Sequence, residues 1–449
     1  MSPARTLSRA RHPLRLPGAT RFWPAAVALF ALLALLGAAG CTGARSGSAA
    51  PPQGELPPNV VWTNRLAVVP DPSGSAVAVA LVTPGSGWEL PGTEGLTHLA
   101  ARAVLEAVRP SLERLGAEAA VSCERAAFTF TMVSPPDTWE DALHIFMEGV
   151  LRPAPGPEAI EDARTALVET LRRDASPARQ ARLAVRQALH GDVLAHEPWA
   201  GPGCGLPEAV AGFSPAEVRA GTHRFDREGA TAAITGPVPP EGTVERLRAW
   251  VPDSLPVPRL RSPDRSSRGR RYVQRGTVTA WTAVAFPYAA GADEEVLRLL
   301  GDLVLASVSP RVDRPEVFDA GFELEPHGSG GSLIVHVTTE PEAALEYGER
   351  VAARVGEIAA DGPPAPLLER TWLRHRGRRL RELATPEARM AVLARDLILR
   401  AAEPRSGWPS SLPPAPARLR NAARSLGAPA FAVVGPPAAR PAAWGGSSP

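Results

Sequence analysis

The sequence predicts an α+β fold of two homologous domains, each a mostly antiparallel sheet with helices packed on one face. Short strand patterns adjoin one another along the chain, and long amphipathic helical patterns follow them. The same landmarks recur in the second half: Pro84 and Pro287, each closing a β-rich run, lie 203 residues apart. Gly236 and Gly435, each before a proline, lie 199 residues apart. Two landmarks with nearly the same offset indicate an internal duplication.

The N-terminus has the features of a targeting segment. Residues 1–40 carry five arginines and no acidic residue, and the apolar run 25–40 is short for a spanning helix. Small residues then precede Cys41, which resembles a bacterial lipoprotein signal peptide whose cleavage leaves Cys41 lipidated. An ordinary signal peptide or an uncleaved anchor is the alternative. Because Thr42 is not aspartate, the resemblance favours the outer membrane, and we expect a periplasm-facing protein of a bacterial cell envelope.

The charge balance excludes a nucleic-acid-binding surface. From Cys41 onward, 44 arginines stand against 47 acidic residues, and the chain has no lysine. A slightly acidic mature chain lacks the basic excess that phosphate recognition requires.

Composition sets the domain boundaries. Residues 41–58 are polar and proline-rich and predict a flexible tether, and 252–271 predict a linker of the same kind. The N-terminal domain is therefore expected at 59–251 and the C-terminal domain at 272–440.

Hydrophobic periodicity gives the elements of the first domain in order. Strands are expected at 66–70, 76–82 and 126–133, and helices at 94–109, 138–151 and 157–174. The segment SPAE at 214–217 predicts a capped helix start, because a serine cap is followed by proline and then glutamate.

The helix expected at 94–109 carries a damaged metal motif. In the inverted zinc motif H-x-x-E-H, two histidines and a glutamate share one helix face. His98 fills the first ligand position, but Ala101 stands at the position of the base and Arg102 at the second ligand. Alanine cannot activate water, and arginine keeps a positive charge beside any dication.

Around this motif the chain resembles the pitrilysin/insulinase family of zinc peptidases, which includes the mitochondrial processing peptidase. The similar segments are NRLAVVPDPS (64–73), GSGWELPGTEGLTHL (85–99), LGAEAAVSCERAAFTFTMVSP (115–135), HEPWAGPGCGLPEAV (196–210) and SPAEVRAGTHRF (214–225). The resemblance implies the two-domain unit of that family, in a catalytically degenerate form.

The resemblance also locates the third zinc ligand. It falls on Thr170 within ARTALVETLRR (163–173), with Glu169 one residue too early. One residue turns a helical side chain by about 100°. We therefore expect no catalytic residue, no bound zinc and no metallopeptidase activity. Arg102 is expected either to pair with Glu169 in the vacant metal space or to lie in solvent.

Inactive chains of this family associate with zinc-competent ones, so the resemblance implies a homologous peptidase subunit as partner and a peptide as substrate. Arg311 and Arg314 match the arginine that such a subunit contributes, although the accompanying tyrosine is missing. A stand-alone peptide-binding or scaffold lipoprotein is the main alternative. A hydrolase with other chemistry is disfavoured, because no G-x-S-x-G motif is present.

Two cysteines remain after Cys41, namely Cys123 and Cys204. An oxidising periplasm would let them pair. Nothing in the sequence places them together, and free buried cysteines are an equal expectation.

Overall fold

The computed structural model describes residues 60–85, 89, 92–191, 201–225, 227–253, 269–327, 330–400, 412–442 and 444. The predicted signal peptide, the tether with Cys41, and residues 254–268 of the linker lie outside this part of the chain. None of the described helices has the length and apolar character needed to cross a bilayer.

The first half forms a six-stranded sheet in the order β1-β2-β6-β3-β5-β4. Its strands are β1 (Val61–Trp62), β2 (Leu66–Pro70), β3 (Val77–Pro84), β4 (Glu118–Cys123), β5 (Ala127–Ser134) and β6 (Thr231–Gly236). All neighbours are antiparallel except β2 and β6. The period of two sends Val79 and Leu81 to one face of β3 and Ala80 and Val82 to the other.

The second half forms a five-stranded sheet in the order β7-β11-β8-β10-β9. Its strands are β7 (Arg270–Gln274), β8 (Ala280–Ala289), β9 (Val317–His327), β10 (Gly330–Thr339) and β11 (Ala430–Gly435). Again one neighbouring pair, β7 and β11, is parallel and the rest are antiparallel. Without the short β1, the two sheets therefore share one strand order and one pattern of directions. Pro287 lies inside β8 rather than at its end, beyond Ala285 where pairing with β11 stops.

Helices cover one face of each sheet, as expected. For the first sheet they are α2 (Leu96–Glu113), α3 (Trp139–Leu151), α4 (Pro157–Arg173), α6 (Pro207–Gly212), α7 (Pro215–Gly221) and α8 (Pro240–Trp250). For the second they are α9 (Glu294–Val308), α10 (Ala344–Asp361), α11 (Ala365–Glu382) and α13 (Pro416–Ser425). The predicted capping box is present at α7, where the side chains of Ser214 and Glu217 each accept from the other residue's backbone N–H.

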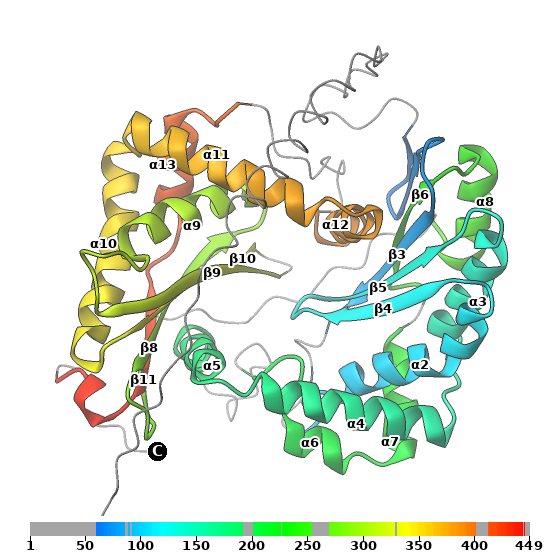
Figure 1. Ribbon diagram of the computed structural model, residues 1–449, viewed down its shortest axis with the longest axis horizontal. Coiled ribbons are helices and arrows are strands. Elements are labelled where there is room, and N and C mark those ends of the chain that lie inside the picture. The colour runs from blue at the N-terminus through cyan, green and yellow to red at the C-terminus, as the bar shows by residue number, and fades with distance from the viewer. Residues whose placement is uncertain are drawn as a thin grey trace, which may run out of the picture. The chain divides into compact units, whose positions relative to one another are not determined.

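The opposite face of each sheet is covered by a helix from the other half of the chain, which the sequence did not indicate (Figure 1). Helix α5 (Pro177–His190) packs on β8 and β11 of the second sheet, and α12 (Pro386–Arg400) packs on β3 and β6 of the first. Alanines face both helices, among them Ala80 and Ala233 below α12 and Ala283 below α5. Small side chains let a helix approach a sheet closely, so this exchange ties the two halves together.

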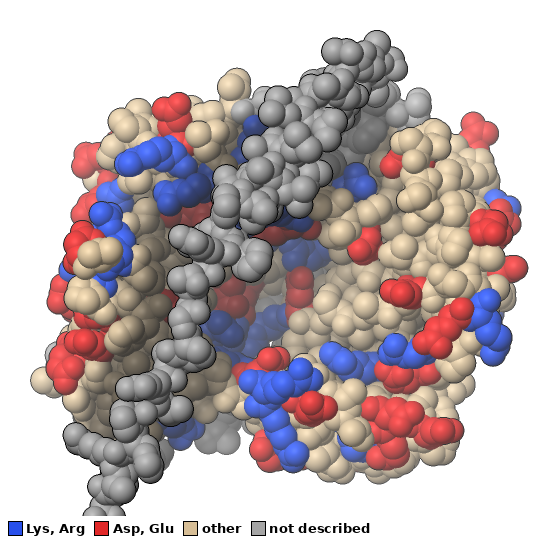
Figure 2. Space-filling view, in the orientation of Figure 1, with Lys and Arg blue, Asp and Glu red and all other residues tan. Residues whose placement is uncertain are grey.

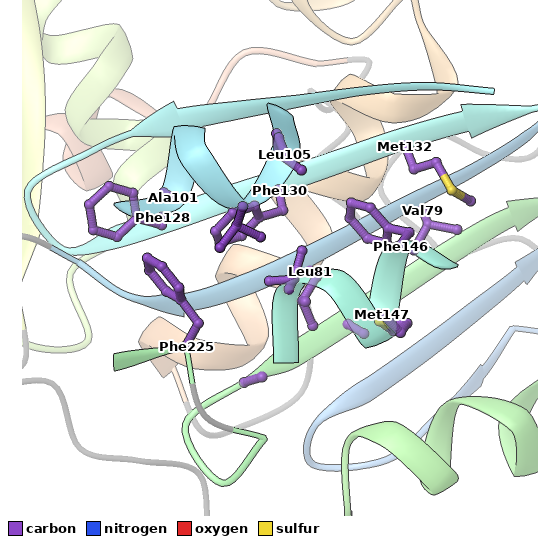
Figure 3. Packing of buried hydrophobic residues seen from close by; sticks show 14 of the residues in the cluster. Val79, Leu81, Ala101, Leu105, Phe128, Phe130, Met132, Phe146, Met147 and Phe225 are labelled. Atoms are coloured by element: carbon purple, nitrogen blue, oxygen red, sulfur yellow. The ribbon is translucent and has the colours of Figure 1, made fainter. Parts of the chain in front are cut away.

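The core of the first half is aromatic where it meets α2 (Figure 3). Phe225 packs edge-on against Phe128 and Phe130, with ring centroids 5.9 and 5.3 Å apart. Ala101 is fully buried in the same core. Each buried phenylalanine contributes about 2–3 kcal/mol of hydrophobic stabilisation, so this core fixes the helix that carries His98.

Candidate functional site

A glycine turn and a buried carboxylate set the start of α2. Gly95 adopts φ 95°, which glycine tolerates best, and a Cβ there would lie 2.8 Å from the Cα of Gly205. The carboxylate of Glu89 accepts hydrogen bonds from the backbone N–H groups of Gly95 at 2.7 Å and Thr97 at 2.6 Å. These bonds satisfy two of the free N–H groups at the helix start. They fix the helix one turn before His98.

His98 is buried, with both ring nitrogens in hydrogen bonds. Its Nε2 lies 3.3 Å from Nε of Arg102, and its Nδ1 lies 3.0 Å from the carbonyl oxygen of Cys204. Arginine only donates, so Nε2 accepts and Nδ1 carries the proton that it donates to Cys204. Burial, with smaller contributions from the charges of Arg102 and Arg179, lowers the pKa of His98 to about 4. The ring is neutral at physiological pH, and its free electron pair points at a guanidinium.

The remaining motif positions do not fit a catalytic zinc, which needs three protein ligands. Ala101 is locked in the core. Thr170 donates its hydroxyl to the carbonyl of Ala166 in its own helix at 2.9 Å. Glu169 is exposed and pairs with Arg173 at 3.5 Å. The hypothesis of an Arg102–Glu169 ion pair is therefore wrong: Arg102 bonds the histidine instead, and Glu169 points to solvent.

Cys123 and Cys204 form a disulfide, which decides the alternative that the sequence left open. The bond joins the end of β4 to the loop before α6, the same loop whose carbonyl accepts from His98. His98 and the two sulfur atoms lie within 4.8 Å of one another, at distances that suit a metal. Thiolates bind metals, however, and a disulfide has none.

His98, Arg102 and Thr170 lie together on the wall of a cavity of about 920 Å³. The wall also includes residues of β4, α4 and α5 and, from the second half, of α9, β9 and α12. Figure 2 shows a hollow on this face with basic and acidic side chains along its walls. The lining contains eight arginines (Arg102, Arg125, Arg173, Arg179, Arg182, Arg186, Arg298 and Arg395) and four acidic residues (Glu124, Asp174, Glu323 and Glu325).

Ion pairs in the cavity wall join α5 to β9. Arg186 donates from Nε to Glu325 at 2.8 Å and from a terminal nitrogen to Glu323 at 3.1 Å. Burial would raise the pKa of Glu325, but Arg186 and Arg125 outweigh burial and hold that pKa below its usual range. On the other side Arg395 of α12 pairs with Glu124 at 2.8 Å. Both halves of the chain therefore contribute charged side chains to the cavity wall.

Sequence reasoning missed this arginine cluster, although a signal was present. Arg179, Arg182 and Arg186 recur at spacings of three and four, which places them on one face of α5. Arg311 and Arg314, which the sequence favoured, lie in the turn between α9 and β9 and are not part of the cavity wall. Arg311 is exposed and pairs with Asp313 at 3.0 Å.

Comparison with known proteins supports the fold. No family model matches the chain, and no curated protein matches its sequence significantly. Among solved structures, the peptidase M16 inactive domain from Pseudomonas fluorescens aligns with a TM-score of 0.66 at 14% identity, over 84% of this chain and 98% of that one. A protease from Helicobacter pylori aligns with a TM-score of 0.63 at 13% identity, over 86% of this chain and all of that one. The chain therefore has the fold of the peptidase M16 inactive domain, as the resemblance to the pitrilysin/insulinase family implies.

Proposed function

We propose that this chain is a non-catalytic peptidase homologue that binds peptides and binds no zinc. The observation that carries the proposal is the hydrogen bond from Arg102 to Nε2 of His98. A metal at Nε2 would have to displace a permanent cation from the one electron pair that the motif retains. No carboxylate stands at the base position to deprotonate water.

Peptide binding is supported by the strands that line the cavity. β4 and β9 are the edge strands of their sheets, and both contribute residues to the wall. An edge strand has unpaired backbone donors and acceptors, to which an extended peptide can add as a further strand. Loss of the metal leaves this mode of recognition intact.

The partner and the location complete the proposal. A zinc-competent homologous subunit would supply the chemistry, and a lipid on Cys41 would hold the complex at the outer membrane of a bacterial envelope. That one structural neighbour is described as an inactive domain is consistent with such a role. A stand-alone peptide-binding lipoprotein remains the second candidate, because the same cavity serves it equally well.

Zinc content and peptidase activity test the loss of catalysis. The purified wild-type chain should bind less than a tenth of an equivalent of zinc, as a rough limit for a site with one blocked ligand. The double variant Arg102→His/Thr170→Glu restores both lost ligand positions and should gain zinc, whereas the same variant with His98→Ala should not. Wild-type chain that binds one zinc and cleaves a peptide in a chelator-sensitive way would overturn the proposal.

Affinity capture distinguishes the two roles. The tagged full-length chain is isolated from the native envelope, and its co-purifying proteins and peptidase activity are measured. A stoichiometric chain with an intact H-x-x-E-H motif and chelator-sensitive activity supports the partner subunit. A monomer that still binds peptide favours the stand-alone lipoprotein.

A further inference from the structure

We infer that the cavity selects acidic peptides, whose carboxylates bind the guanidinium groups of Arg102, Arg179 and Arg298. This inference rests on the proposed peptide-binding function and adds the chemical class of the peptide. It starts from the charge of the cavity wall, where arginines outnumber carboxylates by eight to four. Over the chain from Cys41 onward acidic residues are in excess, so the charge balance of the cavity wall is the reverse of that of the chain.

Three of the four carboxylates in the wall are in ion pairs, and the fourth, Asp174, raises the pKa of Arg179 by its charge. Glu124 is paired with Arg395, and Glu323 and Glu325 are paired with Arg186. Arg182 lies 3.5 Å from Glu323, and Arg173 pairs with Glu169 outside the cavity.

In the part of the chain that the structure describes, three arginines of the wall form no ion pair with a carboxylate. Arg102 donates to His98, and Arg179 donates to the carbonyl oxygen of Gly205 at 3.0 Å. Both acceptors are neutral. Within the described ranges, no carboxylate forms an ion pair with Arg298, which belongs to α9 in the second half of the chain.

The three cations come from both halves and lie where water is partly excluded. Burial lowers the pKa of each of them, and for Arg298 the charges of Arg395 and Arg379 lower it further. Nearby carboxylates (Glu106, Asp174, Glu294 and Glu295) offset these effects only in part. A bound anion relieves this repulsion. Carboxylate suits the task because guanidinium binds it through two parallel hydrogen bonds.

Size and shape favour a peptide as the source of the carboxylates. A cavity of about 920 Å³ falls at the upper end of ligand pockets and holds a short chain segment. The two edge strands in its wall offer backbone partners that a small inorganic anion would leave unused. Acidic side chains of an extended peptide would then reach cations on both sides.

Binding of three matched peptides tests the inference. Fluorescein-labelled decamers of one alanine-based sequence carry glutamate, glutamine or lysine at the same four positions, and their fluorescence anisotropy is titrated with the full-length chain. The glutamate peptide should bind about tenfold more tightly than the glutamine peptide, a difference of about 1.4 kcal/mol. The lysine peptide should bind most weakly. The preference should shrink in 0.5 M salt, because screening weakens ion pairs.

A matched pair of variants tests the location. Arg298→Gln removes a cavity cation without breaking an ion pair, and Arg370→Gln removes the same charge from the exposed face of α11. Arg298→Gln should weaken binding of the glutamate peptide about threefold to tenfold and leave the glutamine peptide unchanged. Arg370→Gln should alter neither. Circular dichroism verifies that both variants remain folded.

The outcomes separate the inference from the function on which it rests. Equal binding of all three peptides overturns the acidic preference and leaves peptide binding intact. Failure of every peptide to bind overturns peptide binding as well. Equal losses in Arg298→Gln and Arg370→Gln would show that the charge acts from outside the cavity, which overturns the assignment of the site.

Discussion

Two buried histidines, one in each half of the molecule, have pKa values shifted in opposite directions. His98 on α2 is 6% exposed, and His375 on α11 is 1% exposed. The pKa of His98 falls to about 4, whereas the pKa of His375 is raised. Burial by itself lowers the pKa of both rings, so burial cannot explain the difference.

The hydrogen-bond partners explain it. His98 faces a neutral carbonyl and a guanidinium, which leave the ring uncharged. His375 lies between two carboxylates, with Nδ1 2.7 Å from Asp302 and Nε2 2.8 Å from Glu295. Those hydrogen bonds outweigh burial and raise the pKa of His375 above its usual value. The direction in which the pKa of a buried histidine shifts in this fold thus follows from what its two nitrogens meet.

The two regions are also held by different forces. His375 joins α11 to α9 as the centre of an ionic cluster, in which Arg378 donates to Asp302 at 2.7 Å and Arg379 lies 3.3 Å from Glu295. The surroundings of His98 are held by a disulfide and backbone contacts. The stability of the region around His375 therefore depends on pH, whereas that of the region around His98 depends on a covalent bond.

Removing the Cys123–Cys204 disulfide near His98 should have the largest effect on the free energy of unfolding. The disulfide closes a loop of sequence separation 81, and its loss should cost about 2–4 kcal/mol of unfolding free energy by the chain-entropy model. Urea unfolding of Cys41→Ser and of the triple variant Cys41→Ser/Cys123→Ala/Cys204→Ala measures the difference. A difference below about 0.5 kcal/mol would mean that the loop at Cys204 is held without the bond.

Removing His375 from its ionic cluster should lower the free energy of unfolding somewhat less. His375→Gln leaves Asp302 and Glu295 without their shared cation and should lower the free energy of unfolding by about 2–3 kcal/mol, below the usual cost of a broken buried pair because Glu295 is partly exposed. The exposed His223→Gln is the control, with an expected change below about 0.5 kcal/mol.

The pH dependence of the stability lost in His375→Gln gives a second test. The folded pKa of His375 lies above 6.5, so its contribution is full below pH 6.5 and is lost as the pH rises through the folded pKa. The pKa values of Asp302 and Glu295 are lowered, so their contributions hold above 4.5 and are lost as the pH falls. The difference between wild type and His375→Gln should peak between these limits. A difference that grows above pH 7 contradicts a protonated His375.

The smallest effect should be seen at His98 itself. NMR titration of its ring should give a pKa of about 4. Removing the nearby positive charge with Arg102→Gln should raise that value, whereas Arg109→Gln, at an exposed position of the same helix, should not. Wild-type His98 titrating near 6.5 would mean that the ring is solvated and that Arg102 does not block it.

Much of the fold was predictable because local patterns carry it. The apolar, β-rich runs at 76–82 and 126–133 gave β3 and β5, and helical spacing gave α3 and α4 to within one residue at each end. Helix α2 was expected to end at residue 109 but continues through Pro110 to Glu113. The exchange of α5 and α12 was not predictable, because an amphipathic helix shows which face it buries but not which sheet receives it. The alanines opposite these helices become informative only when both sheets are known.

The candidate site was predicted only in part, for the same reason. The sequence predicts that Ala101 and Arg102 stand at the base and second-ligand positions of the inverted zinc motif, since i and i+4 share a helix face. The predicted acceptor of Arg102 was wrong. Glu169 lies on α4 one residue before Thr170, the position expected for the third ligand, and its side chain points to solvent. Arg298 and Glu325, far apart along the chain, could not be assigned to one cavity without the fold.

Residue type and short-range spacing were enough to predict two similar sheets, a metal-motif pattern with Ala101 and Arg102 at its base and second-ligand positions, and the charge balance. Only the folded chain shows that Cys123 meets Cys204, that Nδ1 of His98 meets the carbonyl of Cys204, and that arginines from both halves line one cavity. Those are contacts between residues on different elements. Their distances depend on how the helices and sheets pack, which no local pattern specifies.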